Sequence, residues 1–360
     1  MDHRAALSRR RLLQLTARGG ALLGAAALGG CRGLGGAAPQ LLLVRGQLPS
    51  AWSKALPDPW RARPLETPQA VVQAAATPPP ATTLLALGDG WAQQLPTARL
   101  RPLAVEGLLR ELAPMALPPS RLFAPGGSPT LAFPWAFGTW VLLLRNRPDL
   151  LRRRAEGWSL LLDPSLRGRL VLPSSPRVVI ELALRQLGLD PADPAALEDP
   201  NLPGRLAALR RQRLAFDERD GVQLLLAGDA DAAVVPSQRA VPLLLRDPRL
   251  EALLPESGSP LSWQLLLQLG GDGDPVAPLP LEWLRDGLTL PLLDRLMAAG
   301  WVPPLPAQRL EPALARWPRR LRPLLLPPPA VLARCTNLPA FDAAAQRRWQ
   351  TLWDGAMGLA

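Results

Sequence analysis

Histidine is almost absent from this 360-residue sequence, and its only copy is His3. A chain without histidine beyond that point cannot assemble a Ser-His-Asp triad, a Cys-His pair or a usual zinc site. No phosphate-cradling loop or dinucleotide fingerprint follows a strand-like run either. The carboxylates Asp89, Glu181 and Asp217 leave carboxylate-based hydrolysis open, but nothing in the sequence pairs them. We therefore expect no catalytic residues, no cofactor and no enzyme.

Cysteine is equally scarce, with two copies at Cys31 and Cys335. If Cys31 is lipidated, Cys335 has no partner, so we expect no intramolecular disulfide. Segment 271–275 (Gly-Asp-Gly-Asp-Pro) superficially resembles a calcium loop. It lacks oxygen ligands at alternate positions and the closing glutamate, which favours a simple turn. No metal site is expected.

Acidic residues are fewer than basic ones, which gives a formal net charge of +11. The first thirty residues hold five arginines and one aspartate, so the rest of the chain carries +7, spread along its length. No aromatic-interleaved basic stripe and no zinc-finger or similar module is present, so we expect no nucleic-acid partner. Such a basic surface would instead suit anionic lipid headgroups.

The N-terminus carries two targeting signals. Residues 8–13 (Ser-Arg-Arg-Arg-Leu-Leu) resemble the twin-arginine export motif, and the apolar stretch after them is too short and too glycine-rich for a typical membrane span. Residues 28–31 (Leu-Gly-Gly-Cys) resemble a lipobox, which is cut before its cysteine. We interpret residues 1–30 as a twin-arginine lipoprotein signal peptide, Cys31 as the lipidation site and residues 31–38 as a tether.

An uncleaved N-terminal anchor is the alternative interpretation of this leader. Both interpretations place the remaining chain on the periplasmic side of the cytoplasmic membrane, and lipidation would attach it there by acyl chains. No later apolar run reaches membrane-spanning length.

Short apolar runs alternate with helical patterns along the rest of the chain. The runs typical of buried strands are 41–44, 83–87, 131–144, 170–172, 232–235 and 263–269. The patterns with helical spacing are 105–112, 178–187, 205–213, 222–227, 281–286 and 291–299. This alternation predicts an α/β architecture, and about 330 residues suffice for one large or two medium domains.

Four segments resemble, in the same order, the solute-binding subunits of ABC importers, in particular their spermidine/putrescine-binding branch. Residues 131–140 (Leu-Ala-Phe-Pro-Trp-Ala-Phe-Gly-Thr-Trp) are similar to the family's first crossing strand. Residues 158–170, from Trp-Ser-Leu to Arg-Gly-Arg-Leu, resemble the tryptophan-to-lysine-glycine segment that follows it. Residues 255–263 resemble the second crossing, and 281–303, ending Gly-Trp-Val-Pro, the later helices and third crossing.

The resemblance implies a two-lobed periplasmic-binding-protein fold of type II, in which each lobe is a mixed or parallel sheet with flanking helices. Crossing hinge strands join the lobes, which close on a solute held between them. From the order of the three crossings we predict one lobe of residues 39–137 with 264–301, and a second of residues 138–263 with 302–360.

If the resemblance holds, loops at the strand ends line a ligand cleft between the lobes. The implied ligand-binding residues are Arg45, Gln47, Asp89 and Trp91 of the first lobe; Trp135, Phe137 and Thr139 of the first crossing; Ser174, Ser175, Arg177, Asp217, Ser237 and Gln238 of the second lobe; and Trp263 and Gln264 of the second crossing. Each tryptophan taken alone is as readily explained by core packing.

The predicted cleft departs from the family at several acidic positions. Polyamine binding needs carboxylates and aromatic faces. Ser174 and Ser175 stand where the family often has aspartates, and Gln264 where an aspartate is usual. Arg45 and Arg177 would repel a polycation. The serine hydroxyls and backbone N–H groups before a helix suit an anion or a neutral polar ligand, so polyamine remains only the family default.

The resemblance implies a monomeric receptor that delivers a small polar or charged solute to an inner-membrane ABC permease. The missing carboxylates keep an alternative open, in which the chain is a degenerate scaffold that serves as a structural or assembly factor at the membrane without transport.

The leader generates the first testable prediction. Arg9→Lys combined with Arg10→Lys should block export, because the twin-arginine receptor recognises the paired guanidinium groups. Cys31→Ser should leave the protein exported but unanchored or unprocessed. Cell fractionation and globomycin-sensitive processing measure both effects, and wild-type protein recovered from the cytoplasm would contradict the interpretation of the leader.

Overall fold

The structure is a computed structural model that describes residues 38–76, 82–217, 220–270, 277–340 and 342–358. The predicted signal peptide, Cys31, the tether up to residue 37 and the turn predicted at 271–275 lie outside the described residues. Of the two cysteines, Cys335 is described and is free.

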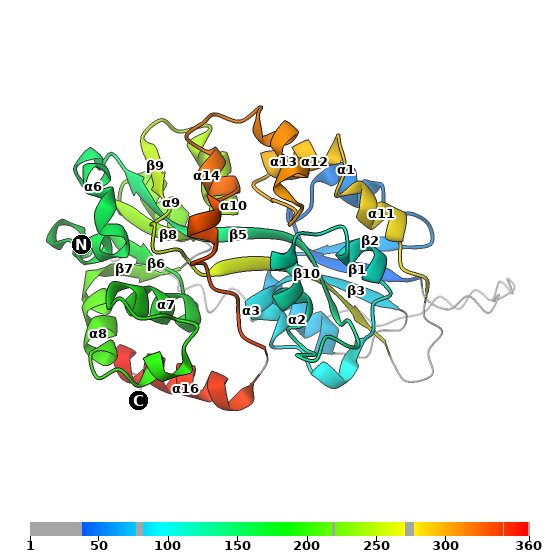
Figure 1. The fold of residues 1–360 in the computed structure, drawn as a ribbon, viewed down its shortest axis with the longest axis horizontal. Coiled ribbons are helices and arrows are strands. Elements are labelled where there is room, and N and C mark those ends of the chain that lie inside the picture. Colours follow the sequence, from blue (N-terminus) through cyan, green and yellow to red (C-terminus); the bar gives the residue numbers. More distant parts are fainter. Residues whose placement is uncertain (1–37, 77–81, 218–219, 271–276, 341, 359–360) are drawn as a thin grey trace, which may run out of the picture. The chain divides into compact units, whose positions relative to one another are not determined.

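The described strands form one mixed sheet of ten strands, which confirms the predicted α/β class. Its main path runs in the order β2-β1-β3-β10-β5-β8-β6-β7, while β4 pairs with β10 and β9 with β5 (Figure 1). The strands are β1 (Gln40–Val44), β2 (Arg61–Leu65), β3 (Thr83–Gly88), β4 (Leu100–Arg101), β5 (Ala132–Arg145), β6 (Leu170–Leu172), β7 (Arg213–Phe216), β8 (Ala232–Pro236), β9 (Leu250–Leu253) and β10 (Leu261–Leu269).

Strand β5 joins the two halves of this sheet. Its residues up to Thr139 pair antiparallel with β10, and its residues from Trp140 onward pair with β8 and β9. We call β1–β4 with β10 the first half of the sheet and β6–β9 the second half. At the centre, Phe137 pairs with Trp263 of β10 and its N–H donates to the carbonyl of Val302 at 2.9 Å. The three segments that resemble crossings therefore lie side by side.

The carboxyl ends of the parallel strands face each other across this junction. In the first half, β1 is parallel to β2 and β3, and Gly88 at the end of β3 lies opposite Gln264 of β10. In the second half, β6 is parallel to β7 and β8, and Pro236 at the end of β8 lies opposite Trp140. Because Gln264 pairs with Ala136, only a few residues of β5 separate the two edges.

Sixteen α-helices connect and cover the described strands. They are α1 (Ser50–Lys54), α2 (Pro68–Ala76), α3 (Asp89–Ala92), α4 (Glu106–Leu109), α5 (Leu117–Ser120), α6 (Pro148–Arg152), α7 (Pro176–Gln186), α8 (Leu202–Gln212), α9 (Gly221–Ala227), α10 (Ser237–Leu244), α11 (Leu281–Asp286), α12 (Leu292–Ala298), α13 (Ala307–Leu314), α14 (Arg322–Leu325), α15 (Pro329–Leu332) and α16 (Ala343–Met357). None of the described helices is both long and apolar enough to cross a bilayer.

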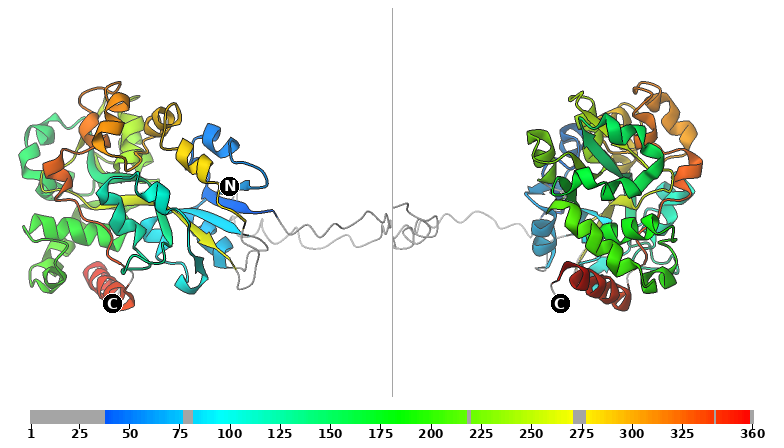
Figure 2. Two further views of the ribbon diagram at one scale, coloured as in Figure 1. Left: turned by 45° about the vertical axis from the view of Figure 1, so that its right-hand side comes forward. Right: turned by 90° about the vertical axis from the view of Figure 1, so that its left-hand side faces the viewer.

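Two hydrophobic clusters hold these layers together. Alternation along β5 sends Val141 and Leu143 into one cluster and Leu142 and Leu144 into the other. The first cluster fills the first half of the sheet and continues under α10 and α14. The second lies between the opposite face of the second half and helices α7, α8 and α16, with α16 drawn in red beside the green helices in Figure 2. Each buried leucine or valine contributes about 1.5–3 kcal/mol to this core.

The edge strand β2 was missed by the sequence prediction because its side chains are mostly exposed and include Pro64. Proline cannot donate to a strand ladder, so it is tolerated at an edge, but the segment then lacks an apolar pattern. The predicted helix 205–213 was too long at its end, since Arg213 begins β7 instead. Parallel pairing with β6 extends this part of the chain.

Gly300 provides a test of the packing at the third crossing segment. Its φ is +86°, and a Cβ there would lie 2.2 Å from the carbonyl oxygen of Gln238. We expect Gly300→Ala to lower the free energy of unfolding by about 3 kcal/mol or more, since backbone strain and a clash with backbone add. Gly46 is the matched control: its φ is +77° but its Cβ would meet nothing within 4 Å.

Gly46→Ala should therefore cost only about 1 kcal/mol. Denaturant unfolding of both variants measures the difference. Equal losses would show that the close approach of Gly300 to α10 does not constrain the fold.

Candidate ligand-binding site

Most residues implied by the resemblance lie at the junction between the two halves of the sheet. Nine of them are buried: Gln47, Asp89, Trp135, Phe137, Thr139, Ser237, Gln238, Trp263 and Gln264. Trp91, Ser175, Arg177 and Asp217 are half-buried, whereas Ser174 and Arg45 are exposed. The junction is thus filled by side chains.

Arg45 pairs within the first half of the sheet rather than across the junction. Its Nη2 lies 2.7 Å from Glu66 Oε1, and both side chains are more than 60% exposed. The neighbouring Val44, not Arg45, is linked to the predicted site residue Gln47, whose Oε1 accepts a hydrogen bond from the N–H of Val44 at 3.0 Å. Arg45 thus follows the carboxyl end of β1 but pairs along that edge with Glu66, which follows β2.

Arg177 connects the two halves. It lies in the first turn of α7, which follows β6, and its Nη1 is 3.6 Å from Oδ2 of Asp89, which follows β3. Its Nε donates to Glu181 Oε1 at 2.7 Å, one helical turn further along α7. Nη1 and Nη2 also donate to the carbonyls of Leu261 at 3.4 Å and Thr336 at 3.2 Å. The Arg177 side chain is 13% exposed.

Glu181 and Thr336 belong to this cluster, although the sequence analysis did not assign them to the site. The Glu181 side chain is 3% exposed and its second oxygen accepts a hydrogen bond from Thr336 Oγ1. Arg185 Nη2 donates to the same Oγ1 at 3.0 Å. The spacing of Arg177 and Glu181 by four residues was a signal for their ion pair, but nothing in the sequence related them to Thr336. We call Asp89, Arg177, Glu181 and Thr336 the Arg177 cluster.

Asp89 is the least satisfied member of the cluster. Its Oδ1 accepts the N–H of Gly90 at 3.0 Å, but its buried Oδ2 has no hydrogen-bond partner. Burial raises the pKa of this carboxyl to about 6, against the opposing charge of Arg177 and the backbone N–H groups of Gly90 and Trp263; Glu181 adds a small further rise. Asp89 Oδ2 is thus an acceptor without a donor.

A second polar group lies on the other face of β10. Ser262 and Gln264 alternate with Trp263, so they point to the face opposite its ring. Gln47 Nε2 donates to Gln264 Oε1 at 2.5 Å, and Gln238 Nε2 donates to Ser262 Oγ at 3.3 Å. The carbonyl oxygens of these amides do not all find donors, since Gln238 Oε1 is buried without a partner.

Gly138 allows α10 to approach β5 at this point. A Cβ on Gly138 would lie 2.1 Å from Gln238 Oε1 and 2.8 Å from Ser237 Oγ. Ser237 Oγ accepts the N–H of Thr139 at 3.1 Å, whereas Thr139 Oγ1 is buried without a partner. The N-terminus of α10 is thereby fixed to the crossing strand.

The predicted aromatic residues of the crossings are packed into the core. Trp135 is 1% exposed and its ring lies 5.5 Å from Trp52 and 5.4 Å from Trp301. Trp263 is 0% exposed, lies 5.5 Å from Phe137 and donates from Nε1 to Asn337 Oδ1 at 2.7 Å. Trp91 is the only predicted aromatic residue of the site that keeps accessible surface. Their role toward a solute stays a prediction.

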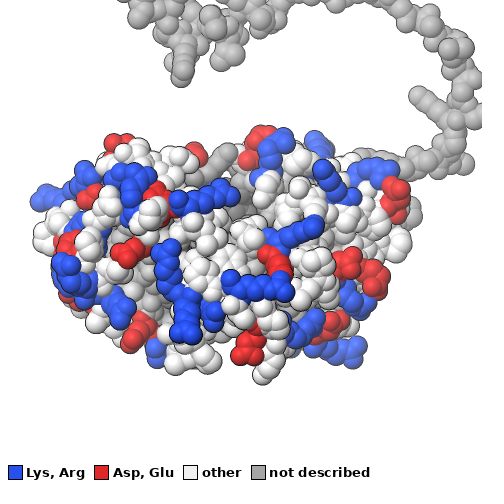
Figure 3. Space-filling model, turned by 90° about the horizontal axis from the view of Figure 1, so that it is seen from above, with Lys and Arg blue, Asp and Glu red and all other residues white. Residues whose placement is uncertain are grey.

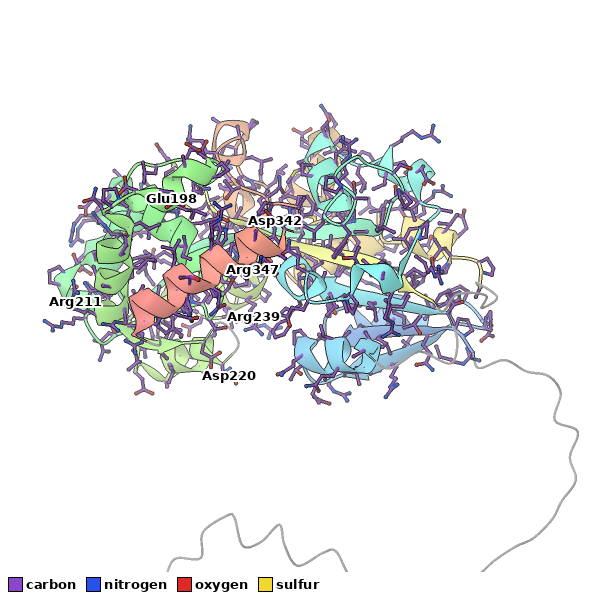
Figure 4. All side chains as sticks on the ribbon, turned by 90° about the horizontal axis from the view of Figure 1, so that it is seen from below. Glu198, Arg211, Asp220, Arg239, Asp342 and Arg347 are labelled. Carbon is purple, nitrogen blue, oxygen red and sulfur yellow. The ribbon has the colours of Figure 1, made fainter. Side chains whose placement is uncertain are left out.

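Residues 335–340 pass over the junction, and we call them the C-terminal strap. Thr336 forms a parallel bridge with Pro260, with its N–H bonded to Ser259 and its carbonyl to Leu261. Gln93 of the first half donates to the carbonyl of Pro339 at 3.0 Å and accepts from Gln346 of α16 at 3.2 Å. In Figure 4, Asp342 marks the end of α16 nearer to the first half. The strap thus touches both halves.

The remaining predicted residues lie at strand ends in the second half. Ser175 is the N-cap residue of α7, without a side-chain hydrogen bond to the helix, and Ser174 precedes it. Asp217 follows β7; its N–H donates to Leu172 at 2.8 Å and its Oδ1 accepts from Asp220 at 2.9 Å. These polar groups face the same carboxyl edge of the sheet as Arg177.

In the described ranges of the chain, no group of three or more His, Cys, Asp or Glu side chains is arranged to hold a metal ion. Two shallow cavities, of about 390 and 500 Å³, lie beside α8 and share Leu162 and Ala208. Viewed from above, charged side chains of both signs are interspersed over the surface (Figure 3). None of the predicted site residues lines these cavities.

The whole fold is similar to solved structures of ABC-transporter proteins. A protein named as a spermidine/putrescine ABC transporter of Listeria monocytogenes is similar with a TM-score of 0.64 and 16% identity, over 90% of this chain and 100% of that one. The spermidine/putrescine ABC transporter substrate-binding protein of Streptococcus pneumoniae gives 0.67 and 15%, over 88% and 97%. The chain has the fold of ABC-transporter substrate-binding proteins.

This fold is shared by proteins that differ in what they bind. Iron-bound HitA of Pseudomonas aeruginosa is similar with a TM-score of 0.58 and 15% identity, over 87% of this chain and 99% of that one. At the level of sequence, no protein-family model and no curated protein matches the chain. The likeness therefore describes the fold alone.

The raised pKa of Asp89 generates a pH prediction. The native state binds this proton more tightly than the unfolded chain, whose carboxyl has a pKa near 3.8, so protonation stabilises the fold. As the pH falls from about 7 through 6 to about 4, the free energy of unfolding of wild type should rise relative to Asp89→Asn, by up to roughly 3 kcal/mol. Urea unfolding across this range measures it, and parallel pH profiles would contradict the burial of an ionisable Asp89.

Proposed function

We propose that the chain is the extracytoplasmic solute-binding subunit of an ABC importer, which captures a small polar or charged solute between the two halves of its sheet and delivers it to an inner-membrane permease. Support comes from the fold, which the chain shares with substrate-binding proteins of ABC transporters over most of both lengths. In this proposal the lobes are residues 39–137 with 264–301, and 138–263 with 302–360.

The observation that carries the proposal is the meeting of Asp89 and Arg177. They follow strands β3 and β6, which belong to different halves of the sheet, and their side chains come within 3.6 Å. Carboxyl ends of parallel strands are the usual binding edge of α/β sheets, and here two such edges face each other. A solute bound there would contact both halves, as closure around a solute requires.

The chemistry at the junction favours hydrogen-bonding solutes. It offers three oxygens of buried residues that have no hydrogen-bond partner: Asp89 Oδ2, Gln238 Oε1 and Thr139 Oγ1. Polyamine is the solute named for two of the similar proteins, but Ser174, Ser175 and Gln264 are neutral in this chain. Polyamines are therefore only one of the classes of solute to be tested.

The proposal includes attachment to the periplasmic side of the cytoplasmic membrane through acyl chains on Cys31. The lipobox-like residues 28–31 and the short tether before β1 support it, since a tether of this kind would let the receptor reach a permease while held at the bilayer. Binding and delivery require no catalytic residues. The scaffold alternative differs from this proposal in one measurable respect, which is the absence of any solute.

Solute binding is measured by thermal unfolding and by mass spectrometry of molecules that co-purify with the protein. At a free concentration about 100 times Kd, linkage stabilises the native state by roughly 2.7 kcal/mol, so the melting temperature should rise by several degrees. The panel comprises polyamines, amino acids, small carboxylates, oxyanions and uncharged polar molecules. If none co-purifies and none shifts unfolding, the scaffold alternative replaces the receptor.

Trp91→Ala tests whether the bound solute lies at the junction. Because Trp91 is the predicted aromatic residue with accessible surface, we expect this variant to weaken binding about tenfold while its unliganded stability changes little. Trp317 is the matched control, since it is also half-buried against the first cluster but lies outside the predicted site. Equal effects of Trp91→Ala and Trp317→Ala would place the solute elsewhere.

A further inference from the structure

The guanidinium of Arg177 is committed to the protein itself. All three of its nitrogens donate: Nε to Glu181, Nη1 to the carbonyl of Leu261 and Nη2 to the carbonyl of Thr336. Nη1 is also the atom nearest to Asp89, at 3.6 Å. An arginine has five N–H donors in a planar fork, and a site that already supplies acceptors to every nitrogen leaves little for an anionic solute.

Asp89 and Glu181 both form their ion pair with Arg177. The Asp89 and Glu181 side chains are 10% and 3% exposed, and each faces Arg177. Arg185 is the other basic group near Glu181, but it donates its hydrogen bonds to Thr336 Oγ1 and to the carbonyls of Ser257 and Arg334. Removing one partner of a buried ion pair leaves an uncompensated buried charge. Without Arg177, both carboxylates would therefore lose their nearest cation, and the native state would be destabilised.

We propose that Arg177 is a built-in counter-ion that occupies the carboxylate site formed by Asp89 and Glu181, and that it thereby excludes cationic solutes from the cleft. This inference rests on the proposed function and names the specificity-determining residue of the same site. A solute ammonium group would have to displace a guanidinium that is part of the same chain and is always near the two carboxylates. The displaced guanidinium would also lose its three hydrogen bonds.

The pairing of Arg177 restricts the class of solute that fits the junction. Each nitrogen of Arg177 already has an acceptor and its charge faces two carboxylates, so it neither recruits an anion nor leaves those carboxylates open to an ammonium group. Asp89 Oδ2 lies 3.6 Å from Arg177 Nη1 but accepts no hydrogen bond, and a hydroxyl or amide group of an uncharged solute would donate one. The junction therefore selects an uncharged polar molecule with a hydrogen-bond donor directed at Asp89.

Arg177→Ala tests the counter-ion directly, with methylguanidinium chloride as the probe and sodium chloride at equal ionic strength as the reference. The variant should melt several degrees below wild type because two buried carboxylates lose their partner. Methylguanidinium should restore part of this loss, roughly 2 °C or more, by binding where the side chain was. Wild type should show no such rise.

Arg185→Ala is the matched control. It removes a second arginine of α7 that also donates to Thr336 of the C-terminal strap, but it leaves Arg177 between Asp89 and Glu181. We expect a lower melting temperature with no response to methylguanidinium. A response of equal size in Arg185→Ala, or none in Arg177→Ala, would overturn the proposal.

Spermidine binding separates this inference from the proposed function. Calorimetry should find spermidine bound by Arg177→Ala about tenfold or more tighter than by wild type. If wild type binds spermidine as tightly as the variant, the receptor function stands and the exclusion of cations is wrong. If wild type binds nothing in the whole panel but the variant responds to methylguanidinium, the counter-ion stands and the receptor function fails.

A second variant covers the case in which Arg177→Ala does not fold. Arg177→Ala combined with Glu181→Gln removes the deeper of the two charges together with the arginine, which leaves Asp89 as the single carboxylate. This variant should still gain melting temperature from methylguanidinium, roughly 1 °C or more, and no gain would overturn the proposal.

Discussion

The backbone pairing along β5 is the constraint on which the rest of the molecule depends. This strand has fourteen residues, and all but the last are buried. Its first part is held by β10 and its second by β8 and β9, so each half of the sheet can form only in register with the other. Because its side chains alternate between two hydrophobic clusters, the same strand also fixes which helices cover which face.

The polar groups at the junction follow from that pairing. Once β3 and β8 end opposite the middle of β5 and β10, the residues after them must lie close together in a region from which water is largely excluded. Buried charges and amides in such a region require partners. This chain supplies them from its own sequence: Arg177 for Asp89 and Glu181, Gln47 for Gln264, and Asn337 for Trp263.

Sharing this fold therefore does not identify the molecule that a protein binds. Proteins named for polyamines and for iron share the fold at 15–16% identity, so the crossing strands and the facing carboxyl edges do not select the solute. Under the proposed function, selection would lie with the few side chains at the junction. In this chain those side chains are mostly neutral or mutually paired, and the C-terminal strap covers them from a part of the sequence far from either strand.

The sequence by itself determined the α/β class, because apolar runs such as 83–87 and 170–172 sit in the strands β3 and β6 almost unchanged. The resemblance of the sequence to a known family brought Asp89, Arg177, Gln238 and Gln264 into one predicted site. Only the tertiary structure decided how they pair. Periodicity is local and reports whether a residue is inside, whereas the contact of Arg177 with Thr336 joins residues 159 positions apart. The same limit hid the burial of Trp135 and Trp263, because a tryptophan in a strand has the same local pattern whether it faces a solute or another aromatic ring.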